Sequence, residues 1–115
     1  DQYGHNLGDK VIQSVASTIQ NNCRDSDSVF RFGGEEFLIL LPRTSATEAI
    51  KLAEKIRNAI ANSPIYSDKL IIEITASAGV SQLNSQETNI ESALKRADDA
   101  LYQAKEQGRN RVITG

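Results

Sequence analysis

Two adjacent carboxylates, Glu35 and Glu36, follow a pair of glycines, Gly33 and Gly34, and are the residues of this chain best suited to chemistry. Glycines carry no side chain that would keep a ligand away from the backbone. Carboxylate oxygens beside such an open approach suit Mg²⁺, which proteins usually hold through one or two carboxylates together with substrate phosphates. The alternative is a Gly-Gly turn flanked by solvated glutamates, and these four residues alone do not separate the two interpretations.

Apolar runs on both sides predict that the two glycines form the turn of a β-hairpin. Residues 29–32 precede the glycines and residues 37–41 follow the glutamates. Two such runs around a Gly-Gly pair are typical of a hairpin with a tight two-residue turn. In that register Arg31 lies opposite Glu36, and the two carboxylates project to opposite faces of the ribbon. We therefore expect an ion pair between Arg31 and Glu36.

Helices and strands are predicted to alternate along the chain, because the hydrophobic period switches between helical and extended patterns. The expected elements are a helix over residues 8–22, the hairpin over 29–41, a helix over 45–62, a strand over 70–80, a helix over 88–107 and a strand over 111–114. Gly79 is expected to mark a bulge or a close approach of another backbone. This order predicts an α/β fold in which helices cover a mainly antiparallel sheet.

Local signals predict where the later helices begin and end. Ser45 with Glu48, and Thr88 with Glu91, have the spacing of capping boxes, which begin helices. Gly108 follows the last helical pattern and is expected to end it.

Composition bounds the class of protein. A chain of 115 residues predicts one domain, and no apolar stretch approaches the ~20 residues of a membrane span. No signal-peptide pattern opens the sequence. The single cysteine, Cys23, cannot form an internal disulfide and is expected to pack as a small apolar residue, which fits a reducing cytoplasm. A net charge of −2 argues against broad nucleic-acid binding, and we expect no direct contact with a membrane.

The whole chain resembles the GGDEF family, the diguanylate cyclases. The run Gly33–Phe37, GGEEF, is one of two common forms of the family signature, and further stretches resemble the family in the expected order at residues 3–9, 24–27 and 97–110. The resemblance runs from end to end, so residues 1–115 are expected to form a GGDEF domain. It implies an α/β (α+β) ferredoxin-like palm, as in other nucleotidyl cyclases.

The resemblance implies that two GTP molecules condense into cyclic di-GMP with release of two pyrophosphates. One domain supplies half of a site, so a homodimer is implied. Two divalent ions, Mg²⁺ or Mn²⁺, would polarise the α-phosphate and stabilise the leaving group. Glu35 matches the metal ligand of the family, and Glu36 matches an acid that either binds metal or activates the attacking hydroxyl. Arg31 matches an arginine near the site that stabilises phosphate charge, an alternative to its ion pair.

The resemblance also implies a substrate site. Asp9 matches the residue that recognises guanine, although a surface acid in the first turn of a helix is the alternative. Gly33 and Gly34 would make room for the nucleotide. Lys105 and Arg109 would clamp the terminal phosphates, whereas favourable interaction with a helix C-terminus is the alternative. His5 is expected to order its loop rather than to bind metal.

Arg24 and Asp27 form an Arg-x-x-Asp pattern that resembles the inhibitory product site of the family. Arg24 would bind a phosphate or a guanine edge of cyclic di-GMP, and Asp27 would accept from a guanine. The alternative is a solvated ion pair in a polar loop.

Family members carry a strand and a helix upstream of the matched region, and that strand supplies a metal ligand. We therefore expect a longer parent protein with a sensory domain upstream, and unpaired strand edges with exposed apolar faces in this segment. Two functions remain open: an active cyclase, or a catalytically silent GGDEF domain that binds GTP or cyclic di-GMP as a regulatory module.

Overall fold

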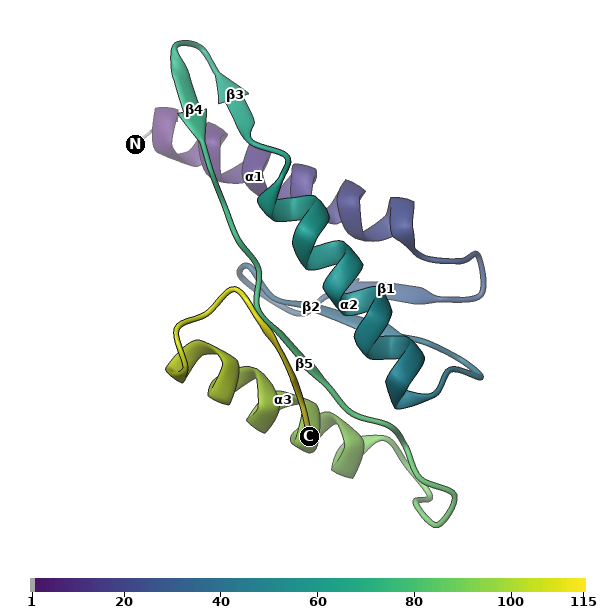
Figure 1. Cartoon of the computed structure of the whole chain (residues 1–115). Helices are drawn as coiled ribbons and strands as arrows, with labels where there is room; N and C mark the ends of the chain where they lie inside the picture. The colour runs from purple at the N-terminus through teal and green to yellow at the C-terminus, as the bar shows by residue number, and fades with distance from the viewer. Residues whose placement is uncertain (1) are drawn as a thin grey trace.

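The computed structural model describes residues 2–115, with the side chains from Leu7 onward. Its helices are α1 (Gln2–Asn22), α2 (Ala46–Ala61) and α3 (Glu91–Glu106). Its strands are β1 (Ser28–Arg31), β2 (Phe37–Leu40), β3 (Ile65–Ser67), β4 (Leu70–Ile72), β5 (Ala78–Val80) and β6 (Val112–Thr114). The molecule is elongated, 52 × 32 × 24 Å, with α1 and α3 toward opposite ends (Figure 1). No helix within residues 2–115 is both long and apolar enough to cross a membrane.

The strands form three separate pairs. β1–β2 and β3–β4 are antiparallel hairpins. β5 and β6 pair in parallel, and α3 lies between them in the sequence. A parallel pair needs a crossover connection, and α3 provides it while packing on both strands. The predicted fold class, helices over mainly antiparallel strands, is confirmed; a single continuous sheet is not formed by the described strands.

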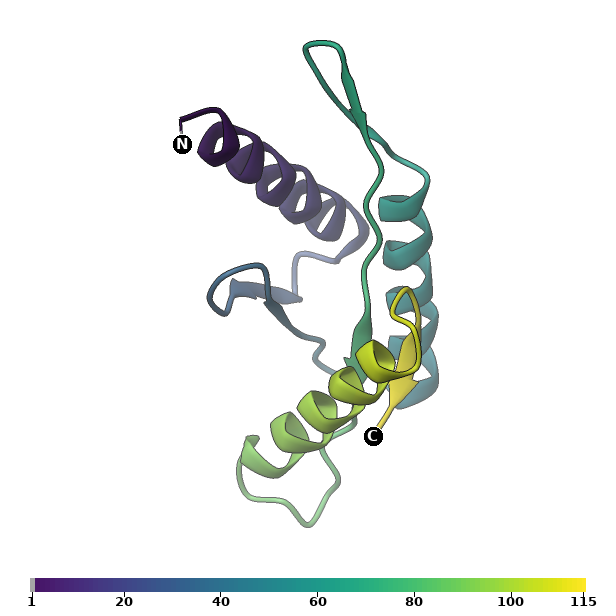
Figure 2. The ribbon, with the colours of Figure 1, turned by 90° about the vertical axis from the view of Figure 1, so that its left-hand side faces the viewer.

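The predicted strand over residues 70–80 is wrong in its extent. The segment pairs at both ends, in β4 and β5, but residues 73–77 between them belong to no strand. The β3–β4 hairpin was not predicted. It turns at Asp68, which adopts the left-handed conformation at φ 52° that aspartate tolerates better than most residues. The hairpin projects beyond the body of the molecule (Figures 1 and 2).

Two of the helix starts differ from prediction. α1 begins at Gln2 rather than near Gly8, so Asp9 lies in its interior and not in a first turn. The capping box of α2 is confirmed, since Ser45 and Glu48 each bond the other's backbone. The second capping box is wrong, because the N-cap of α3 is Ile90, whose side chain forms no hydrogen bond to the helix.

The main core lies between α1, α2 and the β1–β2 hairpin. Ile19, Ile56 and Ile60 are each at most 6% exposed and form its centre. The partly buried residues around them are Val15, Cys23, Val29, Phe37, Ile39, Leu52, Ile74 and Ala76. Cys23 therefore packs as predicted, and burial raises the pKa of its thiol, which disfavours the reactive thiolate.

A second contact, made by small residues, fixes α3 against β5. The buried side chains of α3 are the alanines Ala93, Ala100 and Ala104. Gly79 faces the same helix so closely that a Cβ there would overlap the carbonyl oxygen of Ala97 and the backbone nitrogen of Leu101. The predicted close approach at Gly79 is confirmed, and it determines how near α3 can lie to the strand.

Large apolar side chains of the β1–β2 hairpin remain exposed, and β2 does not pair with β5. Phe30 and Phe32 are 49% and 61% exposed. A cavity of about 880 Å³ lies between β2, β5, α2 and α3, with apolar residues such as Leu38, Val80 and Leu94 in its wall. This exposed apolar surface agrees with the expectation from the sequence.

Replacing Gly79 with Ala should destabilise the protein by about 1–3 kcal/mol, because the new methyl group forces α3 away from β5. Gly8→Ala is the matched control. Gly8 lies inside α1 with open space around it, so alanine there should raise the free energy of unfolding by up to about 1 kcal/mol. Urea unfolding followed by circular dichroism measures both. Equal effects of the two substitutions would show that the close approach does not constrain α3.

Candidate functional site

Residues 32–36 connect β1 to β2, and the hydrogen bond that joins Phe32 to Glu36 leaves a loop of three residues, 33–35, rather than the predicted two. Arg31 pairs with Phe37, one position away from the predicted register. The Phe32 amide donates to the Glu36 carbonyl at 2.8 Å, and the Glu36 amide donates to the Gly33 carbonyl at 3.0 Å. Gly33 and Gly34 have φ values of 105° and 54°, which side-chain-bearing residues adopt at a cost. The extra loop residue is Glu35, which therefore lies at the tip of the hairpin.

Arg31 contacts the turn itself and does not form the predicted ion pair with Glu36. Its Nε donates to the carbonyl oxygen of Gly34 at 2.9 Å. The one-residue change of register explains the difference, since it places Phe37 and not Glu36 opposite Arg31. The guanidinium thus adds a positive charge to the turn that carries the two carboxylates.

Glu35 and Glu36 are both exposed, as are the two glycines before them. Two adjacent carboxylates over an open backbone fit a cation such as Mg²⁺ that takes its remaining ligands from a bound phosphate or water. No cluster of three or more histidine, cysteine, aspartate or glutamate side chains suited to a metal occurs among the described residues. The chain thus offers a partial set of ligands and not a complete cage.

Asp9 lies on α1, with an exposed side chain. It is carried by a different element from the glycine turn. His5 lies outside the described side chains.

Lys105 and Arg109 lie at the end of α3, where the predicted glycine cap is confirmed. Gly108 has a φ of 116°, the Arg109 amide donates to the Ala104 carbonyl at 2.8 Å, and the Gly108 amide donates to the Lys105 carbonyl at 3.4 Å. This Schellman motif fixes the backbone of Arg109 one turn beyond Lys105. Both side chains are exposed, and neither cation forms a hydrogen bond or ion pair within the described part of the chain.

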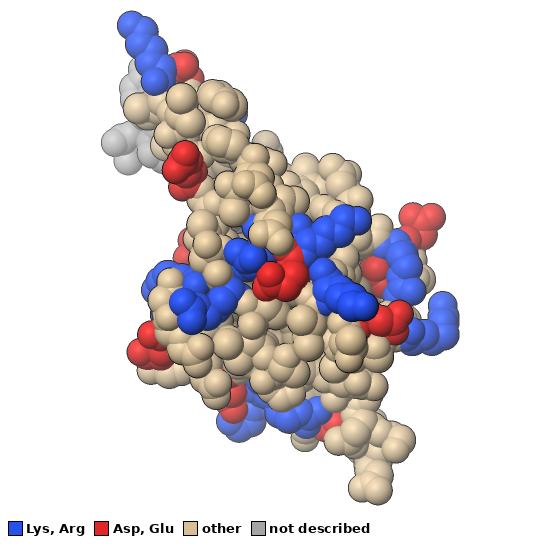
Figure 3. All heavy atoms as spheres, in the orientation of Figure 1, with Lys and Arg blue, Asp and Glu red and all other residues tan. Residues whose placement is uncertain are grey.

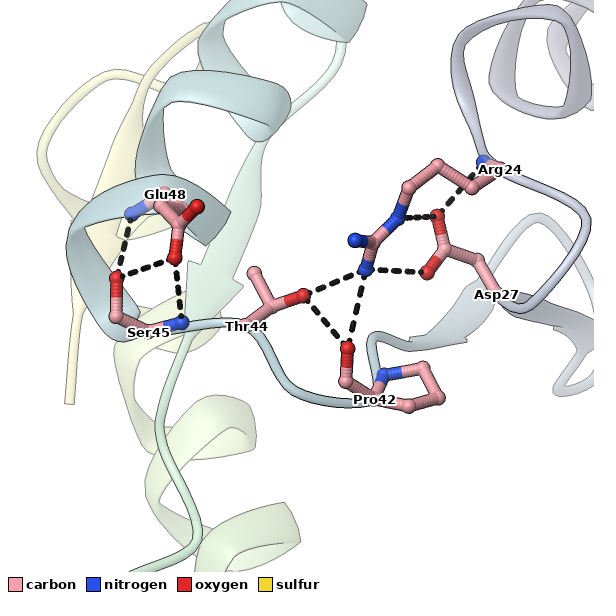
Figure 4. Close-up of polar contacts among 6 residues, drawn as sticks. All are labelled: Arg24, Asp27, Pro42, Thr44, Ser45 and Glu48. Carbon is pink, nitrogen blue, oxygen red and sulfur yellow. Dashed lines mark hydrogen bonds and ion pairs between the residues drawn. The ribbon is translucent and has the colours of Figure 1, made fainter.

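Arg24 and Asp27 form an ion pair, with an Nη2–Oδ1 distance of 3.1 Å (Figure 4). The backbone amide of Arg24 also donates to Asp27 Oδ2 at 2.8 Å. The Asp27 side chain is only 1% exposed, whereas that of Arg24 is 57% exposed. The alternative of a solvated pair is therefore wrong for Asp27, whose carboxylate is turned onto Arg24.

Two partners of Arg24 were not predicted. Its Nη2 donates to the hydroxyl of Thr44 at 2.7 Å and to the carbonyl oxygen of Pro42 at 3.1 Å (Figure 4). Thr44 directly precedes Ser45, the N-cap of α2, so Arg24 ties the α1–β1 loop to the start of α2. No sequence pattern indicates this contact, because the partners are 18 and 20 residues away along the chain.

The predicted site residues therefore fall into four places, one each on α1, the glycine turn, the end of α3 and the α1–β1 loop. The structure brings Arg31 onto the turn and Arg24 onto Asp27, and it keeps the other groups on separate elements. Basic and acidic side chains are interspersed on the face seen in Figure 3 and do not form one basic patch.

Comparison with known proteins identifies the fold and the family. The profile described as "Diguanylate cyclase, GGDEF domain" matches residues 1–111. The chain belongs to the GGDEF family. Diguanylate cyclase A of Treponema denticola is 44% identical over 112 residues, which cover 97% of this chain and 30% of that protein. This chain thus spans less than a third of that relative.

Solved structures of the GGDEF family superpose on the whole chain. The GGDEF domain of DgcB from Caulobacter crescentus, in complex with c-di-GMP, has a TM-score of 0.92 at 35% identity and covers 99% of this chain and 68% of that one. The active GGEEF domain of a diguanylate cyclase from Vibrio cholerae has a TM-score of 0.87 at 39% identity and covers 99% and 72%. The resemblance and the fold class expected from the sequence are both confirmed.

The Arg24–Asp27 pair predicts a pH dependence of stability. Burial raises the pKa of Asp27, but hydrogen bonds and charge from Arg24 outweigh it, so the pKa lies below its ordinary value. A lowered pKa in the folded state stabilises the protein above the unfolded pKa of about 3.9, and this stabilisation is lost as the pH falls further.

Asp27→Asn should therefore unfold more readily than the natural protein at pH 7, and the difference should shrink between about pH 4 and pH 2. Urea unfolding at several pH values measures it. Asp25→Asn, in the same loop but exposed, is the control and should have little effect. A difference that stays constant down to pH 2 would contradict this account of the ion pair.

Proposed function

We propose that this GGDEF domain is a diguanylate cyclase, which condenses two GTP molecules into cyclic di-GMP and releases two pyrophosphates. The observation that carries the proposal is the glycine turn, where two exposed carboxylates and the Arg31 guanidinium lie beside two exposed glycines. The 46% identity to the diguanylate cyclase DgcM of Escherichia coli supports the same reaction.

Phosphoryl transfer needs alignment and charge neutralisation above all, and the residues of the turn suit both. Gly33 and Gly34 admit the triphosphate to the backbone. Glu35 at the tip binds metal, and Glu36 either binds metal or accepts the proton of the attacking 3′-hydroxyl. Arg31, held against the Gly34 carbonyl, stabilises negative charge on the α-phosphate.

Mg²⁺ or Mn²⁺ fits the two carboxylates and would supply Lewis-acid polarisation of the phosphate when bound. Lys105 and Arg109, whose exposed cations have no partner among the described residues, hold the terminal phosphates. Asp9 reads guanine, because a carboxylate can accept from both N1–H and the 2-amino group, a pair that adenine lacks.

The reaction joins two identical nucleotides, and each turn holds one of them. We therefore propose a homodimer in which two domains face each other across the bound nucleotides. Because the domain fills less than a third of a full-length relative, we also propose that it works within a longer signalling protein, under an upstream sensory domain. GTP is a cytoplasmic nucleotide, so we place the domain in the cytoplasm.

Glu35→Gln should lower cyclic di-GMP formation at least ~100-fold, because the substitution removes the charge that neutralises the metal ion while keeping the size of the side chain. Purified protein containing residues 1–115 is given GTP and Mg²⁺, and the product is quantified by chromatography. Glu73→Gln, an exposed glutamate outside the turn, is the control and should remain active. ATP should give no product.

Two outcomes would contradict the proposal. Near-normal turnover by a folded Glu35→Gln variant would remove this residue from the metal site. A folded dimer of the unsubstituted protein that binds GTP but forms no cyclic di-GMP would favour the silent regulatory module.

We propose further that Arg24 and Asp27 form a site for the product. Asp27 orients the guanidinium, and Nη1 of Arg24, which forms no hydrogen bond within the described residues, is left to bind a phosphate or a guanine edge. The site lies at the opposite end of β1 from the turn, so bound product inhibits by fixing how two domains face each other.

Arg24→Lys should weaken cyclic di-GMP binding about tenfold, because lysine keeps the charge but loses the planar fork. Initial GTP turnover should stay within about twofold of the natural protein, since the substitution lies away from the turn. Calorimetry with cyclic di-GMP gives the affinity, and thermal unfolding checks the fold. Equal affinities of the two proteins would show that the Arg-x-x-Asp match is a coincidence of a polar loop.

A further inference from the structure

The turn that follows α3 contains three consecutive residues in the left-handed region. Gly108, Arg109 and Asn110 have φ values of 116°, 64° and 50°. Glycine adopts this region freely and asparagine tolerates it, but an arginine does so only where the surrounding structure holds it there. The unusual backbone of Arg109 therefore needs a physical cause in its neighbours.

The side chain of Arg111 bonds this turn directly, since its Nε donates to the Arg109 carbonyl at 3.1 Å. The residue that ties the turn to the rest of the molecule is Asn110, which contacts two other elements. Its backbone amide donates to the hydroxyl oxygen of Ser77, just before β5, at 3.0 Å. Its side-chain oxygen accepts from Nη1 of Arg57, on α2, at 2.7 Å. Arg57 is itself held by an ion pair with Glu54 at 3.0 Å. Both the backbone and the side chain of Asn110 are thus held, and this constrains the backbone of Arg109, the residue before it.

Arg109 therefore has a fixed backbone and a guanidinium that is available to a ligand. The Schellman bond to Ala104 fixes Arg109 on one side, and Asn110 fixes it on the other. The guanidinium is exposed and forms no hydrogen bond or ion pair with any described residue. A turn held so closely around an unpaired charge is the arrangement expected of a preorganised binding group.

We propose that Asn110, supported by Ser77 and Arg57, is a positioning residue that presents Arg109 to the terminal phosphates of the nucleotide. The inference rests on the proposed phosphate-binding role of Arg109. Asn110 touches no substrate; it lowers the cost of ordering Arg109 when the nucleotide binds. The competing account is that Ser77 and Asn110 only close the crossover between β5 and β6, in which case they affect stability and not nucleotide affinity.

Three substitutions separate the accounts. Asn110→Gly keeps the left-handed backbone available but removes the amide that accepts from Arg57. Ser77→Ala removes the oxygen that accepts from the Asn110 backbone, and Ser77→Thr retains it. Arg109→Ala removes the cation itself. The probe is guanosine 5′-(α,β-methylene)triphosphate with Mg²⁺, measured by calorimetry on the dimeric protein, with thermal unfolding alongside.

We expect Asn110→Gly and Ser77→Ala to weaken binding of the probe about fivefold, the scale of one lost hydrogen bond. Arg109→Ala should weaken it at least as much, and Ser77→Thr should restore the natural affinity. If Ser77→Ala fails to fold, the comparison of Asn110→Gly with Ser77→Thr carries the test.

Affinities of Asn110→Gly and Ser77→Ala within about twofold of the natural protein, with Arg109→Ala impaired, would overturn the positioning role and leave the proposed function intact. An unimpaired Arg109→Ala would overturn the phosphate role of Arg109, and the positioning role with it.

Discussion

The candidate site depends on the positive φ angles of Gly33 and Gly34, which allow the chain to reverse within three residues. This reversal sets the register of β1 against β2, and the register decides which face of the hairpin meets the core. Val29, Phe37 and Ile39 then pack toward Ile19, Ile56 and Ile60, while the carboxylates remain at the exposed tip. Any side chain at the two glycines would strain the turn and obstruct the approach to its backbone. A single backbone constraint therefore serves both packing and access.

A similar principle recurs at two other charged groups, where neighbouring groups fix a cation and leave some of its donors free. Nε of Arg31 donates to the Gly34 carbonyl, and Nη2 of Arg24 donates to Thr44 and Pro42. The side chain of Arg109 forms no hydrogen bond with a described residue, and its backbone is held by the helix cap and by Asn110. The guanidinium groups of Arg31 and Arg24 are thus oriented, whereas Arg109 is held only through its backbone. A ligand that binds there meets donors already in place, which reduces the ordering cost of binding.

The sequence predicts best where the signal is local. The capping box at Ser45, the glycine cap at Gly108 and the close approach at Gly79 each follow from a few neighbouring residues, and each is confirmed. The turn length could not be predicted, because Gly-Gly allows both a two-residue and a three-residue loop, and the bond from Arg31 to Gly34 appears only with the longer one. The Arg24–Thr44 and Asn110–Ser77 contacts join residues 20 and 33 positions apart, so no periodicity reveals them. The capping box predicted at Thr88 is wrong because the side chain of Asn89, and not that of Thr88, accepts from the Glu91 amide.

The central claim is that the tip of the β1–β2 hairpin binds a divalent ion together with a nucleotide. Paramagnetic Mn²⁺ broadens the amide signals of nearby residues, so a heteronuclear spectrum recorded as Mn²⁺ is added with a non-hydrolysable GTP analogue locates the ion directly. Our account predicts selective broadening at Gly34, Glu35 and Glu36, and its loss in a Glu35→Gln variant. Broadening centred on other acidic pairs, such as Asp98 and Asp99 of α3, with the turn unaffected, would contradict it.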